Sequence, residues 1–124
     1  MNVPKSKEIV YCAHSHFTKD MSPMIAQYVV MKGKVPIDPF LTLPSDVMDA
    51  MGYDGPTRLT LDLILLSVCD ELWIFGQNKD DYTPGVQQEN NYWMMKKNGD
   101  ILHVSFEEVF EYVMNHKDMM INNA

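Results

Sequence analysis

The chain has 124 residues and a mass of 14.3 kDa, a length typical of one domain with its own core. Acidic residues outnumber basic ones by 17 to 10, which gives a net charge of −7. Because such a domain repels phosphate groups, we expect no nucleic-acid or membrane partner. There is no long apolar run or signal-peptide core, and both cysteines lie in apolar contexts, so we predict a cytoplasmic protein with reduced thiols.

The first half of the chain alternates short apolar runs with a helical pattern. Residues 8–13 predict a strand buried on both faces, and the polar residues after them predict a loop. Ser22 and Pro23 are typical of the N-cap and first position of a helix, which Gly33 ends. Residues 35–40 predict a short strand, and its prolines indicate a sheet edge.

The second half continues the alternation. Its predicted elements are a short helix at 44–51, an apolar helix at 57–68, a strand at 71–75, a helix at 84–97, a strand at 100–104 and a helix at 106–116. Ser105 and Glu108 have the spacing of a capping box for the last helix. This order predicts an α/β fold, a small flavodoxin- or Rossmann-like three-layer sandwich with a mainly parallel sheet of four or five strands.

In a parallel α/β sheet, ligands bind beyond the carboxyl ends of the strands. Segments that follow the predicted strands meet at this edge with the start of the third long helix. The predicted ligand-binding residues are His14, Ser15, His16, Asp38, Pro39, Phe40, Arg58, Gly76 and Gly85. Gly85 leaves backbone N–H groups at the start of its helix open to a polar or anionic ligand.

Asp62 is a carboxylate in an apolar helix, where it is costly unless it is paired or hydrogen-bonded. Its position along the helix puts it level with the ligand-binding edge. It is either a site residue or a structural carboxylate that caps a loop or pairs with Arg58, one turn earlier.

Glu89 follows Val86 by three residues, which puts it on or beside the inner face of its helix with its carboxylate aimed at the same edge. The predicted inner face comprises Val86, Asn90, Trp93, Met94 and Lys97. The alternative for Glu89 is an exposed side chain in an ordinary turn.

Three further positions have both a structural and a functional interpretation. Tyr11 either packs in the core with a satisfied hydroxyl or holds a catalytic carboxylate. Cys12, His14 and His16 alternate as metal ligands can, but no fourth ligand occurs at a characteristic spacing, so we predict no metal site. The histidines are expected to line the ligand site or lie in solvent. Asp70, in a turn at the opposite end of the sheet, is expected to be structural.

These residues together resemble the nucleoside 2-deoxyribosyltransferase-like superfamily, which includes deoxyribosyltransferases, nucleotide N-glycosidases and small uncharacterised proteins, several of them from phages and bacteria. The matching motifs are Tyr11 near the end of the first strand, the run from Asp62 to Asp70, in which the second aspartate follows the first by eight positions, and the run from Gly85 to Glu89. The resemblance covers roughly residues 8–104, and residues 69–76 are especially similar to the small members.

The resemblance implies cleavage or transfer of an N-glycosidic bond in a nucleoside, nucleotide or nucleotide-derived small molecule, without a cofactor. It implies that Glu89 is the nucleophile, that Asp62 handles the leaving base and that Tyr11 orients Glu89. Burial in an apolar helix is expected to raise the pKa of Asp62 toward that of a general acid. Ser15 and the backbone at Gly85 are candidates for binding the sugar or a 5′-phosphate.

Two departures from the family pattern favour an alternative. Asn91 stands where active members have a second glycine, and residues 14–16 replace a glycine-containing loop. The alternative is a non-catalytic module that binds a nucleotide or a nucleotide signal on the same scaffold.

We treat residues 1–124 as one domain with a core at about 8–116 and a tail at 117–124. The small size, an exposed sheet edge and apolar helix faces predict a homodimer or higher homo-oligomer. Members of the superfamily are commonly dimers or larger, with a neighbouring chain closing the site. The tail is a candidate to dock across such an interface.

Overall fold

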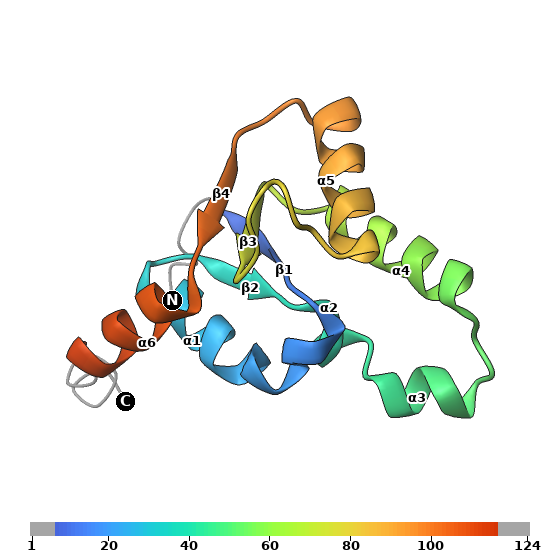
Figure 1. The fold of residues 1–124 in the computed structure, drawn as a ribbon, viewed down its shortest axis with the longest axis horizontal. Coiled ribbons are helices and arrows are strands. Elements are labelled where there is room, and N and C mark those ends of the chain that lie inside the picture. Colours follow the sequence, from blue (N-terminus) through green and yellow to red (C-terminus); the bar gives the residue numbers. More distant parts are fainter. Residues whose placement is uncertain (1–6, 117–124) are drawn as a thin grey trace, which may run out of the picture.

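A computed structural model describes residues 7–116 and shows a three-layer α/β sandwich (Figure 1). The middle layer is a four-stranded, all-parallel sheet in the order β2-β1-β3-β4. The strands are β1 (Ile9–Ala13), β2 (Val35–Ile37), β3 (Glu71–Phe75) and β4 (Ile101–Val104). The predicted fold class is therefore confirmed, with four strands, and β2 is an edge strand as its proline content predicts.

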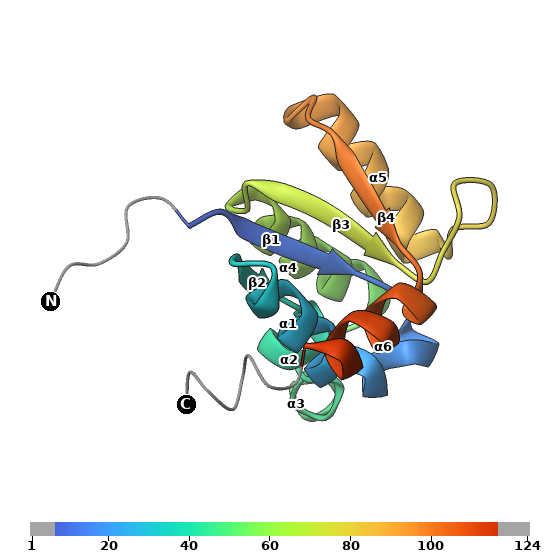
Figure 2. The same cartoon turned by 90° about the vertical axis from the view of Figure 1, so that its left-hand side faces the viewer.

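Helices connect the strands and cover both faces of the sheet. They are η1 (His16–Met21, a 3₁₀-helix), α1 (Ser22–Met31), α2 (Pro39–Thr42), α3 (Ser45–Ala50), α4 (Gly55–Ser67), α5 (Pro84–Lys96) and α6 (Phe106–Asn115). α1 and α6 cover one face, and α4 and α5 cover the other (Figures 1 and 2). None of the helices within residues 7–116 is both long and apolar enough to cross a bilayer. The predicted tail at 117–124 lies outside the described residues.

Alternate residues of β1 contribute to two separate cores. Val10 and Cys12 pack in the core under α1 and α6, whereas Tyr11 and Ala13 pack in the core under α4 and α5. This division follows from the two-residue period of a strand. Cys12 and Cys69 are both buried and free, in agreement with reduced core thiols. The same period places Tyr11 on the face of the sheet that α4 and α5 cover.

The segment predicted as a loop at 14–21 contains η1. Ser15 caps this helix, because its Oγ accepts a hydrogen bond from the Phe17 backbone N–H at 3.1 Å. The prediction that Ser22 caps α1 is wrong. Ser22 already has helical backbone angles, and the cap residue is Met21, which makes no side-chain cap bond.

Two boundaries differ from the predicted ranges because an aspartate caps the next helix. β2 is shorter than 35–40 because Asp38 Oδ1 accepts a hydrogen bond from Phe40 N–H at 2.9 Å and starts α2. α4 begins two residues before the predicted residue 57, because Asp54 Oδ1 accepts from Thr57 N–H at 2.8 Å.

Two polar residues have the structural positions expected of them. Asp70 Oδ2 accepts a hydrogen bond from Ile9 N–H at 2.8 Å, at the start of β1. Ser105 Oγ accepts from Glu108 N–H at 3.1 Å and caps α6. The Glu108 carboxylate does not complete the predicted capping box, because it accepts a hydrogen bond from the Tyr28 hydroxyl at 3.3 Å.

Candidate functional site

The strand order reverses at the carboxyl ends of β1 and β3, where ligands bind in open α/β sheets. A cavity of about 380 Å³ opens there between the segments of η1, α2, α4 and α5. This volume lies within the range of small-molecule sites. The predicted site residues that line it are His14, Ser15, His16, Pro39, Phe40, Asp62, Gly85 and Glu89.

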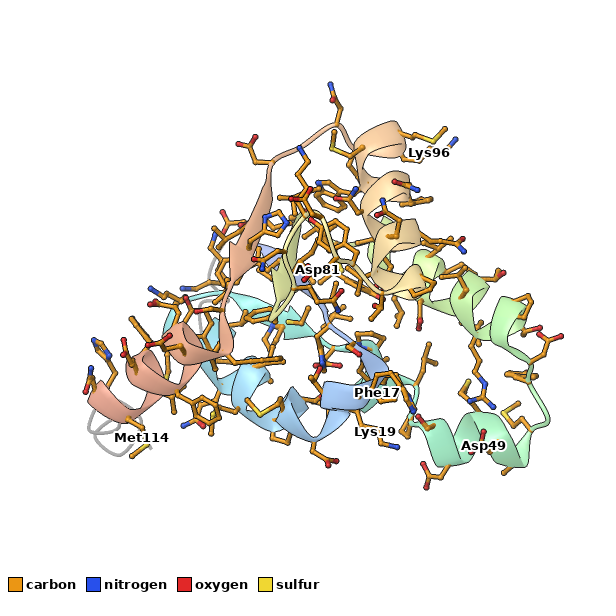
Figure 3. All side chains as sticks on the ribbon, in the orientation of Figure 1. Phe17, Lys19, Asp49, Asp81, Lys96 and Met114 are labelled. Atoms are coloured by element: carbon orange, nitrogen blue, oxygen red, sulfur yellow. The ribbon has the colours of Figure 1, made fainter. Side chains whose placement is uncertain are left out.

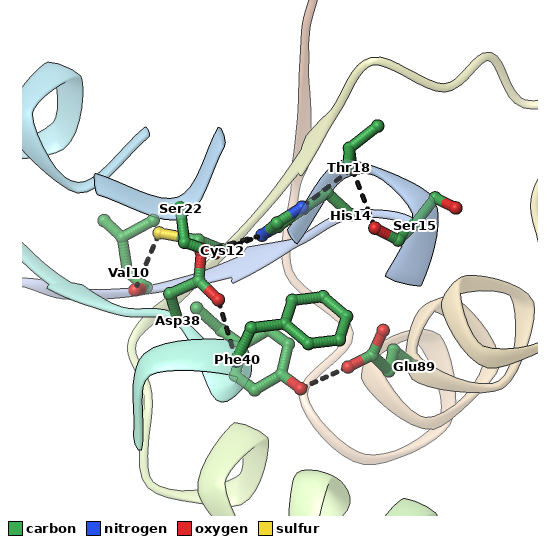
Figure 4. Close-up of polar contacts among 10 residues, drawn as sticks. Val10, Cys12, His14, Ser15, Thr18, Ser22, Asp38, Phe40 and Glu89 are labelled. Atoms are coloured by element: carbon green, nitrogen blue, oxygen red, sulfur yellow. Dashed lines mark hydrogen bonds and ion pairs between the residues drawn. The ribbon is translucent and has the colours of Figure 1, made fainter. Parts of the chain in front are cut away.

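Glu89 lies on the inner face of α5 and is only 5% exposed. The Tyr11 hydroxyl donates a short hydrogen bond to Glu89 Oε2, which Figure 4 shows. Tyr11 itself is fully buried at β1, so its position is set by the sheet. The exposed-turn alternative for Glu89 is therefore wrong. Tyr11 packs in the core with a satisfied hydroxyl, and the partner of that hydroxyl is the Glu89 carboxylate.

The inner face of α5 is narrower than predicted. Val86, Glu89 and Trp93 are buried at spacings of three and four residues. Asn90 is partly buried, but Met94 and Lys97 are exposed, contrary to prediction. Met94 lies about 100° round the helix from Trp93, and Lys97 is the C-cap residue beyond the last turn.

Burial raises the pKa of both cavity carboxyl groups. The pKa of Glu89 rises from 4.5 to about 8, because desolvation and the charges of Asp62 and Asp38 outweigh the lowering effect of the Tyr11 hydrogen bond. The pKa of Asp62 rises from 3.8 to about 6, through desolvation first and the charge of Asp38 second, in the predicted direction. Desolvation and the nearby Glu89 raise the pKa of Tyr11 well above 10, so its phenol remains a donor.

His14 and Asp38 form a buried pair at the edge of the cavity. Their Nε2 and Oδ2 atoms are 2.7 Å apart, and both side chains are 0% exposed. His14 Nδ1 lies 2.9 Å from Thr18 Oγ1, so the pair connects the η1 segment with the start of α2 (Figure 4). The Phe40 ring packs edge-on against His14, with centroids 4.9 Å apart. His14 thus lines the cavity from the interior, whereas His16 is exposed.

Arg58 does not pair with Asp62. Its guanidinium binds the Asp49 carboxylate, and its Nε donates to the Tyr53 carbonyl at 2.9 Å. The structural alternative that paired Asp62 with Arg58 is therefore wrong. Arg58 and Asp62 both line a recess of about 90 Å³, which shares Asp62 and Phe40 with the main cavity.

Gly76 lies away from Glu89 and Asp62. Its φ is +72°, and a Cβ there would clash with the Phe106 ring, so close packing explains the glycine. It lines a larger concavity of about 630 Å³ with Tyr28 and neither cavity carboxylate. We locate the candidate site in the smaller cavity, because two carboxyl groups with raised pKa converge there.

Sequence reasoning missed several residues around the cavity. Phe17, on η1, is 91% exposed and lines the cavity (Figure 3). The sequence feature that could have identified Phe17 as a site residue was an aromatic side chain in an otherwise polar segment. Thr83 precedes α5 without capping it through its side chain. The N–H groups of Gly85 and Val86 in the first turn therefore have no helical partner and adjoin the cavity.

Possible metal ligands are dispersed. Within residues 7–116, no group of three or more His, Cys, Asp or Glu side chains is arranged to hold a metal ion. Cys12 packs in the core under α1 and α6, whereas His14 and His16 line the cavity. The groups available to a ligand are therefore carboxyl, hydroxyl, imidazole, aromatic and backbone N–H groups.

Comparison with known proteins gives a family match. A family model described as a domain of unknown function (DUF7768) matches residues 11–99. This range covers most of the chain and includes Tyr11, Asp62 and Glu89. No curated protein and no solved structure matches the chain.

Proposed function

The chain belongs to the DUF7768 family, and we propose that it cleaves or transfers the N-glycosidic bond of a nucleoside, nucleotide or nucleotide-derived small molecule. The observation that carries the proposal is the convergence of Glu89, with its Tyr11 partner, and Asp62 on one cavity at the reversal of strand order. Two carboxyl groups in unequal environments are the pair that glycosidic chemistry requires.

Glu89 is the nucleophile in this mechanism. One carboxylate oxygen attacks the anomeric carbon while the Tyr11 hydroxyl holds the other. The electron pair of the broken C–N bond moves to the leaving base, which takes a proton from Asp62. Water or a second base then attacks the anomeric carbon, gives its proton to Asp62 and releases the Glu89 carboxylate. Water gives a hydrolase, and a second base gives a transferase.

The resting protonation state differs from the reacting one. With a pKa of about 8 for Glu89 and about 6 for Asp62, Glu89 is mostly protonated and Asp62 mostly ionised at pH 7. Transfer of one proton from Glu89 to Asp62 costs about 3 kcal/mol, the equivalent of a pKa difference of about 2. The positive charge that develops on the sugar offsets this cost, because it favours an ionised Glu89 in a desolvated site.

The remaining walls of the cavity supply recognition. Phe17 and Phe40 offer aromatic surface to a base, and the N–H groups at the start of α5 offer donors to sugar oxygens. Ser15 Oγ accepts a hydrogen bond from the backbone, so its proton is free to bind a sugar oxygen. Asp38 acts indirectly in this proposal, by holding His14 and the start of α2.

A second candidate function is ligand binding without cleavage. The raised pKa of Glu89 favours it, because a protonated carboxyl donates a hydrogen bond to a ligand and does not attack it. In this case the same cavity holds a nucleotide or a nucleotide signal. Asn91 and residues 14–16, which differ from the pattern of active superfamily members, then serve to bind the ligand without cleaving it.

Release of free base from a panel of nucleosides, nucleotides and dinucleotides tests the proposal. Glu89→Ala should lower the rate at least about a hundredfold, whereas Glu107→Gln, which removes an exposed carboxylate on α6, should leave it unchanged. If the wild-type protein releases no base from any member of the panel, the catalytic proposal is wrong. Calorimetric binding of a ligand that is recovered intact would then support the binding module.

We also propose that the protein acts in the cytoplasm as a homodimer or higher homo-oligomer. Exposed apolar side chains support an interface on the outer face of α5 and on the edge strand β4, where Met94, Met95 and Leu102 are 55%, 79% and 46% exposed. Size-exclusion chromatography with light scattering measures the oligomeric state.

A further inference from the structure

The cavity at Glu89 is acidic. Its described lining contains Glu89 and Asp62 and no lysine or arginine. Asp38 lies behind the wall as a third carboxyl group, and its charge acts on both cavity carboxyl groups. The lining also contains two histidines. The His14 side chain is fully buried against Asp38, so it is committed to that pair, whereas His16 is exposed and solvent screens any charge on it.

Two basic side chains, Arg58 and Lys19, line hollows that share Phe40 with the main cavity. Arg58 lines the neighbouring recess and forms an ion pair with Asp49. Lys19 lines a separate hollow, beside Asp20 and Phe40. Neither supplies a free positive charge to the main cavity, so neither is placed to compensate a phosphate bound beside Glu89.

The start of α5 offers only a small positive partial charge to offset the negative charge of the cavity. Pro84 has no N–H group, and Gln87 N–H already donates to the Thr83 carbonyl at 2.8 Å, so two N–H groups remain, those of Gly85 and Val86. A helix N-terminus is worth roughly half an elementary charge. At pH 7 Glu89 is mostly protonated and Asp62 is mostly ionised, so the full charge of Asp62 outweighs this partial charge, and the cavity repels an anion and attracts a cation.

On the basis of these charges, and resting on the function proposed above, we propose that the site takes N-glycosides whose base is a positively charged heteroaromatic ring and which carry no 5′-phosphate. Pyridinium and 7-alkylpurinium nucleosides belong to this class. The aromatic surface fits the same ligand, because Phe17 and Phe40 line the cavity together with Glu89 and a delocalised cation binds aromatic faces.

A cationic base also simplifies the chemistry. Glu89 is mostly protonated in the free site, so it releases its proton to solvent when the cationic ligand binds and takes one up again when the products leave. Its carboxylate attacks C1′, the C1′–N bond breaks, and both electrons of that bond go to the ring nitrogen, whose positive charge disappears. No proton is needed by the leaving base, so Asp62 remains an anion that stabilises the cationic sugar. Water then attacks C1′, the bond from C1′ to Glu89 breaks with its electrons returning to the carboxylate, and one proton passes to solvent. The sum is cationic glycoside plus water giving neutral base, free sugar and one proton.

Three closely matched probes test the substrate class. Nicotinamide riboside carries a permanent pyridinium charge, its 1,4-dihydro form is uncharged, and nicotinamide mononucleotide adds a 5′-phosphate. Calorimetry measures their binding to Glu89→Gln, which keeps the side-chain length and cannot form the covalent intermediate. Nicotinamide riboside should bind at least about tenfold more tightly than either other probe. Adding Asp62→Asn should reduce this preference below about threefold, whereas adding Glu107→Gln should not change it.

The outcomes separate the two proposals. Equal binding of the riboside and its dihydro form, or tighter binding of the mononucleotide, overturns the inference, as does the absence of binding by all three. If the wild-type protein nevertheless releases base from uncharged nucleosides, the proposed function stands without the charge preference. If it cleaves no glycoside but the charge preference is present and depends on Asp62, the inference holds for a ligand and the catalytic proposal fails.

Discussion

Glu89→Gln should change the way stability depends on pH. The pKa of Glu89 in the folded protein is about 8, above the ordinary value of 4.5, because the carboxyl group is buried. The folded state therefore binds more protons than the unfolded state between these two pH values. Stability from this group is fully present below about pH 4.5, and it is lost as the pH rises through 8.

The size of the effect follows from the two pKa values. Between pH 5 and pH 8, the proton linkage of Glu89 removes about 3–4 kcal/mol from the free energy of unfolding. Glutamine is uncharged, has the same length and still accepts the hydrogen bond of Tyr11, so it removes this pH dependence. At pH 5 the two proteins should agree within about 1 kcal/mol, and at pH 8 the variant should be more stable by about 3 kcal/mol.

Urea denaturation at pH 5, 6, 7 and 8 measures the difference, followed by the fluorescence of the buried Trp73 and Trp93. Subtracting the two curves cancels the titration of the groups that do not interact with Glu89. Glu107→Gln, exposed on α6, is the matched control and should differ from the wild type by less than about 0.5 kcal/mol at every pH. A Glu89→Gln difference that stays constant from pH 5 to pH 8 would show that Glu89 ionises like an exposed carboxylate, and would refute the reasoning.

Two further substitutions test the contacts around the cavity. Tyr11→Phe removes the hydrogen bond that lowers the pKa of Glu89, so the pH at which the Glu89-dependent stability is lost should move upward. The total stability lost in the same urea titration, carried on above pH 8, should therefore be larger than in the wild type, and an unchanged loss contradicts the contact. Asp38→Ala removes one partner of a fully buried pair and the cap of α2, so it should lower the free energy of unfolding by about 3–5 kcal/mol. The control Asp46→Ala removes an exposed carboxylate and should lower it by less than about 0.5 kcal/mol. A cost below about 1 kcal/mol for Asp38→Ala would show that the pair contributes little.

Local signals determined most of the fold. These signals are apolar runs of strand length, helical periodicity, and residues such as Gly33 and Pro84 that end or begin a helix. They depend only on neighbouring residues, and they locate the four strands of the sheet and the long helices to within a few residues. The errors lie where two local signals compete. Ser22 resembles a helix cap, but the η1 segment before it is already helical. The strand signal at 35–40 ends early because Asp38 caps a helix within it.

The sequence also singled out two carboxylates, because Asp62 stands in an apolar helix and Glu89 stands on or beside the inner face of its helix. It could not show their partners. The Tyr11–Glu89 hydrogen bond joins residues 78 positions apart, and the His14–Asp38 pair joins residues 24 apart. Such contacts depend on how helices sit against the sheet, which no local pattern encodes. Only the tertiary structure shows that Gly76 packs against Phe106 outside the site and that Arg58 pairs with Asp49. It also shows that Glu89 is buried deeply enough to raise its pKa, because desolvation is a property of the assembled cavity.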